Sequence, residues 1–139
     1  MTPPHIVLIE DNPADVFLIK LALKENGVEH TLTHFERADQ AIQVLCSDTQ
    51  GNALVPHAIL LDLNTPGGAD GFDALHRFKT SPRLSDIPIA VLTSSRDAKD
   101  KERVTIQGAR YIEKASQLNE FLASVGKAVK QMLDVSQIR

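Results

Sequence analysis

The stretch His57-Ala58-Ile59-Leu60-Leu61-Asp62-Leu63-Asn64 decides how the rest of the sequence is interpreted. Its apolar run has the length of a buried strand, and the turn residues Pro66-Gly67-Gly68 follow it. The run ends in a carboxylate, Asp62, and burying a charge is costly unless other groups compensate it. Asp62 on its own is also a typical Asx-turn residue. A functional site is predicted if further polar groups reach the same end of the strand.

The remaining strand candidates are two apolar runs, one more polar run and one short run near the C-terminus: residues 6–9, 89–92, 30–35 and 109–112. Helical patterns separate them and close the chain, from Pro13 to a stop at Gly27, over 38–45, over 71–79, over 97–107 and from about 116 to 133. Buried strands alternating with amphipathic helices predict an α/β fold, with a five-stranded parallel sheet that is doubly wound with five helices.

Composition narrows the class of protein. The 139 residues predict one domain over 1–139 with no output domain. A single cysteine, Cys46, no membrane-length apolar run and no signal-peptide pattern predict a cytoplasmic protein without membrane contact. A net charge of -3 argues against nucleic-acid binding.

Polar residues follow four of the five predicted strands. Glu10 and Asp11 follow the first, Asp62 ends the third, Thr93 ends the fourth and Lys114 follows the fifth. The carboxyl ends of parallel strands meet at one edge of the sheet, where ligands bind. Converging carboxylates repel each other, and a divalent cation with oxygen ligands, Mg²⁺ rather than Ca²⁺, relieves this. A lysine and a hydroxyl beside such a centre are suited to hold a phosphoryl group, which an Asp carboxylate can accept.

With these residues the chain resembles the receiver domain of bacterial two-component response regulators, across nearly its whole length. Glu10-Asp11, Asp62, Thr93 and Lys114 match in order, and Tyr111 matches the family's switch aromatic. The resemblance implies a flavodoxin-like sheet of strand order 2-1-3-4-5. It also implies that Asp62 accepts a phosphoryl group from a sensor histidine kinase, and that the protein-binding face then changes.

The same resemblance implies a role for each matched residue. Glu10, Asp11, Asp62 and the backbone carbonyl of Asn64 would hold Mg²⁺. Thr93 and Lys114 would contact the phosphoryl oxygens, and Thr93 and Tyr111 would form the switch. The stretch from Glu10 to Asp15 resembles single-domain regulators associated with bacterial phytochrome kinases. The implied partners are a bacteriophytochrome and a downstream protein or phosphotransfer partner.

Three departures from the family pattern leave alternatives open. Ala115 stands where a proline usually follows the lysine, the turn from Pro66 to Gly71 is one residue longer than usual, and Ser95 is smaller than in many relatives. One alternative is a degenerate receiver that binds partners without phosphorylation. Another is a haloacid-dehalogenase-like phosphatase, which requires a second Asp where this chain has Asn64.

The last predicted helix carries two adjacent apolar stripes. The first contains Leu118, Phe121, Val125, Ala128 and Met132, and the second contains Leu122, Val129 and Leu133. One stripe must cover the sheet, so the second leaves apolar surface for a homodimer. The alternative is that both stripes lie in the core of one chain.

Overall fold

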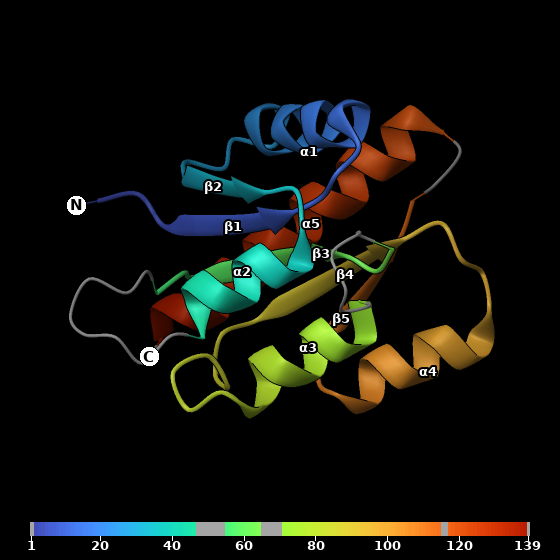
Figure 1. The fold of residues 1–139 in the computed structure, drawn as a ribbon. Helices are drawn as coiled ribbons and strands as arrows, with labels where there is room; N and C mark the ends of the chain where they lie inside the picture. The colour runs from blue at the N-terminus through green and yellow to red at the C-terminus, as the bar shows by residue number, and fades with distance from the viewer. Residues whose placement is uncertain (1, 47–54, 65–70, 115–116, 139) are drawn as a thin grey trace.

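The computed structural model describes residues 2–46, 55–64, 71–114 and 117–138, with side chains as far as residue 134. Strands and helices alternate along the chain (Figure 1): β1 (His5–Ile9), α1 (Pro13–Glu25), β2 (Thr31–Phe35), α2 (Ala38–Leu45), β3 (Ala58–Asp62), α3 (Gly71–Thr80), β4 (Ile89–Thr93), α4 (Ala98–Ile106), β5 (Arg110–Glu113) and α5 (Leu118–Ile138). All strand pairs are parallel, in the order β2-β1-β3-β4-β5. The predicted flavodoxin-like fold is confirmed.

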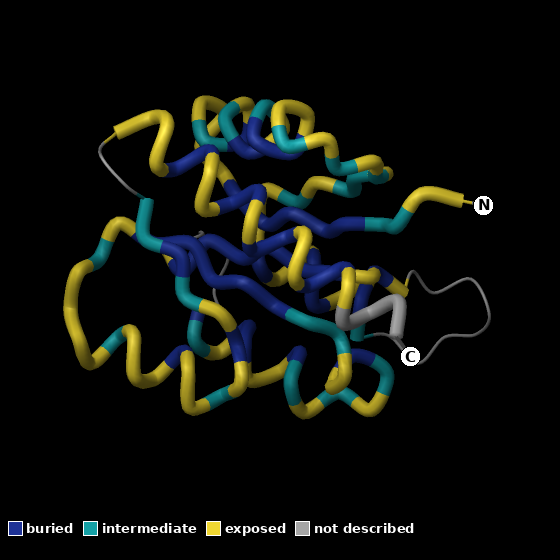
Figure 2. The backbone as a smooth tube through the Cα atoms, turned by 180° about the vertical axis from the view of Figure 1, so that it is seen from behind, coloured by how far each residue is buried: buried dark blue, intermediate teal, exposed yellow. Residues whose placement is uncertain are grey.

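The sheet separates two apolar cores because neighbouring strand residues point to opposite faces. Ile6 and Leu8 of β1 pack with α1 and α5 on one face. Val7 and Ile9 pack with α2, α3 and α4 on the other. The central strands are buried along their length, whereas the helices alternate between buried and exposed residues (Figure 2).

The edge position of β2 explains its polar sequence. Each residue of β2 is exposed or partly exposed, and among the described strands it pairs only with β1. Leu32 packs against one core and Phe35 against the other. Polar residues on an edge strand also disfavour pairing with another chain.

Helix boundaries differ from the sequence prediction where capping residues lie outside the helix. Asn12 caps α1, with the Ala14 N–H donating to Asn12 Oδ1 at 2.9 Å. Asp97, predicted inside the fourth helix, is instead its N-cap. The last helix continues to Ile138, beyond the predicted end at Leu133, because no glycine or proline follows to stop it.

None of the helices in these described ranges combines the length and apolar character of a membrane span.

The expectation of surplus apolar surface on the last helix is wrong for the described side chains. Both stripes are buried in the core with β1, β3, β4 and α1, except Leu118, which is 50% exposed: Phe121, Leu122, Val125, Ala128, Val129, Met132 and Leu133. The reason is that α5 packs against α1 as well as against the sheet. The second stripe therefore serves the chain's own core, and a dimer through this helix loses the apolar surface on which the prediction rested.

The contact between α1 and α5 depends on one asparagine and one glycine. Asn26 Nδ2, at the C-cap of α1, donates to the carbonyl of Ala22 at 2.7 Å and to that of Leu122 at 3.2 Å. A Cβ atom on Gly126 would lie 2.2 Å from Asn26 Nδ2. Gly126 thus provides the space in which Asn26 links the two helices.

We predict that Gly126→Ala changes the free energy of unfolding in opposite directions, depending on the residue at position 26. In the native background the new methyl displaces the Asn26 amide, so the free energy of unfolding falls, by about 1 kcal/mol for the lost hydrogen bonds. In an Asn26→Ala background the clash is absent, and the better helix propensity of alanine stabilises the protein by about 0.5–1 kcal/mol. Urea unfolding of the four proteins tests this. Destabilisation of equal size in both backgrounds would contradict the contact.

Candidate functional site

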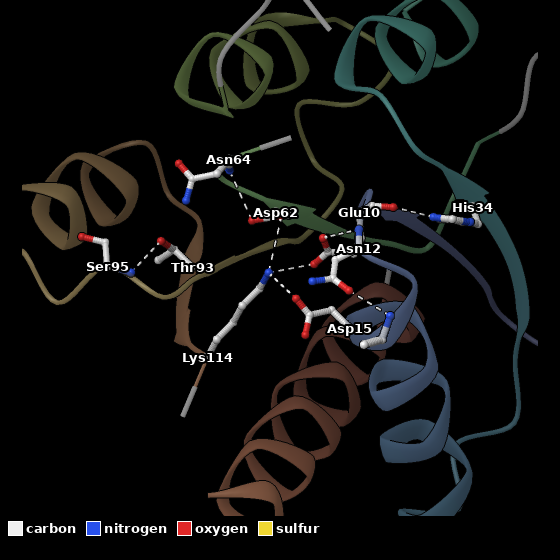
Figure 3. Close-up of polar contacts among 10 residues, drawn as sticks. Glu10, Asn12, Asp15, His34, Asp62, Asn64, Thr93, Ser95 and Lys114 are labelled. Atoms are coloured by element: carbon white, nitrogen blue, oxygen red, sulfur yellow. Dashed lines mark hydrogen bonds and ion pairs between the residues drawn. The ribbon is translucent and has the colours of Figure 1, made fainter. Parts of the chain in front are cut away.

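Four strand ends bring the predicted site residues together at one edge of the sheet (Figure 3). Glu10 directly follows β1, Asp62 ends β3, Thr93 ends β4 and Lys114 directly follows β5. Glu10 and Thr93 are fully buried and Asp62 is 4% exposed. Acidic residues are almost never fully buried unless they are paired, so this burial marks a built site.

Three carboxylates form the acidic part of the site. Oxygen atoms of Glu10, Asp11 and Asp62 all lie within 4.8 Å of one another, and Asp11 is exposed. Burial raises the pKa of Glu10 to about 7, and the adjacent Asp62 carboxylate adds to the rise while Lys114 opposes it. Taking the charged form out of water and placing it near a like charge both favour protonation. The cluster therefore carries excess negative charge that a cation would relieve.

Lys114 supplies positive charge to this cluster. Its Nζ lies 2.9 Å from Glu10 Oε1, 2.9 Å from Asp15 Oδ2 and 3.5 Å from Asp62 Oδ2. Burial lowers the pKa of Lys114, but hydrogen bonds to Glu10 and Asp15 and the nearby Asp62 charge raise it above its ordinary value. The ammonium therefore stays protonated and holds the carboxylates together.

Sequence reasoning missed two residues of this arrangement. Asp15 has no predicted role at the site, yet its Oδ2 lies 2.9 Å from Lys114 Nζ. The signal available was its place in the first turn of the helix that leaves the end of β1. His34 has no predicted role either, and its Nε2 donates to the Glu10 carbonyl at 2.6 Å. No pattern in the sequence indicated that bond.

Backbone contacts fix the position of Asp62. The Asn64 N–H donates to Asp62 Oδ1 at 3.2 Å, and the Leu63 N–H donates to the carbonyl of Leu92 in β4 at 2.9 Å. The Gly71 N–H in turn donates to the Leu63 carbonyl at 3.1 Å. A Cβ atom on Gly71 would lie 2.2 Å from that carbonyl oxygen, so only glycine lets α3 begin this close to the site. The longer turn predicted between Pro66 and Gly71 lies largely outside the described residues.

Thr93 and Tyr111, the predicted switch pair, both contact Ser95. The Ser95 N–H donates to Thr93 Oγ1 at 3.0 Å, and the Tyr111 hydroxyl donates to the Ser95 carbonyl. Ser95 Oγ donates to Asp100 Oδ2 at 2.8 Å and so joins the loop to α4. Burial raises the pKa of Tyr111, and the nearby charges of Glu113, Asp100 and Asp97 add to this. The two switch candidates are thus linked through one residue.

The β4 and β5 ends are tied by a backbone bond from the Lys114 N–H to the Thr93 carbonyl at 2.7 Å. Ala115 and the peptide bond that joins it to Lys114 lie outside the described residues.

Chemically, the site combines oxygen ligands suited to a hard divalent cation with a buried carboxylate and an ammonium. The donor set fits such a cation, because the three clustered side chains offer only oxygen atoms. A phosphoryl group on Asp62 would meet both the cation and Lys114, which is the electrostatic arrangement that phosphoryl transfer needs.

Known proteins show the same arrangement of sequence and fold. The response regulator Rcp1 of Synechocystis sp. is 38% identical over 101 residues, which are 70% of this chain and 67% of Rcp1. The phosphorylated cyanobacterial phytochrome response regulator RcpA superposes with a TM-score of 0.83 and 32% identity, over 95% of each chain. The Mn²⁺-bound form of Rcp1 superposes with a TM-score of 0.82 and 32% identity, over 95% of this chain and 96% of Rcp1.

The family model described as the response regulator receiver domain matches residues 6–126. That span covers most of the chain and contains all four strand ends that form the site. The chain therefore belongs to the response regulator receiver domain family.

Proposed function

We propose that this receiver domain accepts a phosphoryl group on Asp62 from a sensor histidine kinase and signals through the resulting change of its surface. One observation carries the choice of Asp62. Its nearly buried carboxylate lies beside both other clustered acids and 3.5 Å from Lys114 Nζ. Glu10 shares the burial, the acidic cluster and the contact with Lys114, but its Oε1 already holds the ammonium at 2.9 Å, whereas Asp62 ends the central strand β3 between β1 and β4.

In the proposed reaction an oxygen of the Asp62 carboxylate attacks phosphorus, and the bond from phosphorus to the kinase histidine nitrogen breaks. The Asn64 N–H keeps the carboxylate oriented by holding Oδ1. A divalent cation, which we propose is Mg²⁺, would be held by Glu10, Asp11, Asp62 and the backbone carbonyl of Asn64, and would offset charge on the phosphoryl group.

Lys114 and Thr93 would respond to the new phosphoryl group. Lys114 already lies at the acceptor carboxylate and can bind one phosphoryl oxygen. The Thr93 hydroxyl would leave the Ser95 N–H to donate to another. Because the Tyr111 hydroxyl is bonded to the Ser95 carbonyl, movement of this loop would also move the tyrosine. Phosphorylation of Asp62, a local change of charge, would thus shift the loop at Ser95 and Tyr111 from one arrangement to another.

The partner we propose is a histidine kinase of the bacteriophytochrome class. Support comes from the phytochrome response regulator RcpA, which resembles this chain over 95% of its length. The output would be a downstream protein or phosphotransfer partner in the cytoplasm, and the only reactions would be the domain's own phosphorylation and dephosphorylation. We propose that residues 1–139 act as one receiver domain. A homodimer stays a prediction, without the support of surplus apolar surface on α5.

We predict that Asp62→Asn abolishes labelling by acetyl phosphate in the presence of Mg²⁺, because the amide is not a nucleophile. Mass spectrometry should show an added phosphoryl group on the native protein and none on the variant. Asp39→Asn is the matched control, since Asp39 is an exposed acid paired with Arg37. Equal labelling of native protein and Asp62→Asn would place the acceptor elsewhere.

We predict that Lys114→Met raises the affinity for Mg²⁺ about tenfold. The ammonium lies 2.9 Å from Glu10 and 3.5 Å from Asp62, so it competes with a cation for the same oxygens. A tenfold change corresponds to about 1.4 kcal/mol, which is modest for removing a like charge at this distance. Calorimetric titration tests it, with Lys24→Met on exposed α1 surface as control. Unchanged affinity would mean that the cation does not bind at this cluster.

We predict rapid phosphotransfer from an autophosphorylated bacteriophytochrome kinase. Radiolabel should move from the kinase to this protein faster than from an unrelated histidine kinase, because receiver surfaces are matched to their kinases. Transfer that is equally slow from both kinases would count against the phytochrome pathway while leaving the acceptor role of Asp62 intact.

A further inference from the structure

Asp15 is a charged residue of the site for which the proposed reaction has no role. It lies in the first turn of α1, with a side chain 23% exposed, and its Oδ2 is 2.9 Å from Lys114 Nζ. Figure 3 shows it reaching the lysine from the α1 side, whereas Asp62 approaches from the sheet. Asp15 does not belong to the described group of three acids that can share a metal ion.

The hydrogen bonds of the Lys114 ammonium leave one donor for a new acceptor. An ammonium has three N–H donors. Glu10 Oε1 and Asp15 Oδ2 each accept one at 2.9 Å. Asp62 Oδ2 lies at 3.5 Å, longer than an ordinary charge-assisted hydrogen bond. The donor on the side of Asp62 is therefore the one available to a phosphoryl oxygen.

Glu10 holds the ammonium less strongly when a cation binds. Its carboxylate is one of the three that can hold the ion, and a bound cation offsets the negative charge that attracts the lysine. Asp15 is then the carboxylate on the α1 side that keeps its charge for the ammonium. Its own position is fixed by the start of α1, where Asn12 caps the helix and Pro13 occupies the first position. A lysine without such an anchor loses more side-chain entropy when it becomes ordered.

We propose that Asp15 is a positioning residue that keeps the Lys114 ammonium directed at the phosphoryl site after a bound cation has weakened the hold of Glu10. The proposal rests on the proposed function of Asp62. It assigns Asp15 no contact with the phosphoryl group itself and no part in holding the metal.

Simple electrostatics and positioning predict opposite changes in the affinity for an anion when Asp15 is removed. Removing a negative charge near an anion-binding site strengthens anion binding by Coulomb attraction. Removing the residue that orders the lysine weakens it, because the lysine must then be ordered at the expense of binding energy. The sign of the change therefore separates the two effects.

The experiment measures beryllofluoride affinity, as a phosphoryl substitute, at saturating Mg²⁺. It compares native protein, Asp15→Ala, Lys114→Met and the double variant. We expect Asp15→Ala to weaken binding about fivefold in the native background and not at all in the Lys114→Met background, since the coupling of two contacting residues disappears when one is absent. Asp15→Glu should restore part of the loss. Glu25→Ala, which removes a charge from the exposed last turn of the same helix, is the matched control.

A second measurement does not depend on beryllofluoride. In the Mg²⁺-saturated protein the Nζ signal of Lys114, identified by its absence from Lys114→Met, should be sharp in nitrogen-15 spectra and broadened by exchange with water in Asp15→Ala.

The outcomes separate this inference from the proposed function. Tighter or unchanged beryllofluoride binding in Asp15→Ala, equal weakening in both backgrounds, or an unaltered Lys114 signal overturns the role of Asp15 alone. Beryllofluoride binding that survives Asp62→Asn, or that is absent from native protein, overturns the proposed function and this inference with it.

Discussion

The site depends on a charge imbalance at the end of a buried sheet. Three carboxylate side chains gather within 4.8 Å, and Lys114 is the ammonium that contacts Glu10 and Asp62 among them. Burial makes the imbalance matter, because charges that water would screen at the surface interact strongly here. The metal-free domain is stabilised by the lysine, and any added cation or phosphoryl group must redistribute the same contacts. Binding of a cation or a phosphoryl group would therefore require the contacts of Lys114 to rearrange.

The fold places these charges by repeating one device. Each parallel strand delivers its last residue to the same edge, and the backbone there is tied to its neighbour, as the Lys114 N–H is to the Thr93 carbonyl at 2.7 Å. The apolar residues before each strand end fill two cores and carry no chemistry of their own. The site is thus held by the rigid sheet, whereas the residues that can respond lie in the loops and first helical turns that follow it.

Sequence patterns predicted what depends on local order. Strand ends at Asp62 and Thr93 followed from apolar runs that stop at a polar residue, and the parallel sheet then required them to meet. Sequence patterns did not predict that Asp15 pairs with Lys114. The two residues are 99 positions apart, and the packing of α1 against the sheet brings them together. The last helix shows the same limit. Its two apolar stripes were visible, but the sequence did not say that α1 covers the second.

Ser95 connects the site to Tyr111 and α4 through three hydrogen bonds. Its N–H is bonded to the Thr93 hydroxyl, its carbonyl to the Tyr111 hydroxyl and its side chain to Asp100 of α4. If Thr93 turns to a phosphoryl group, only the first of these bonds must break. The other two still attach the loop to Tyr111 and α4, so displacement of the loop pulls on both. The first two bonds use backbone groups that any residue supplies, and serine adds the hydroxyl that ties the loop to Asp100 at 2.8 Å.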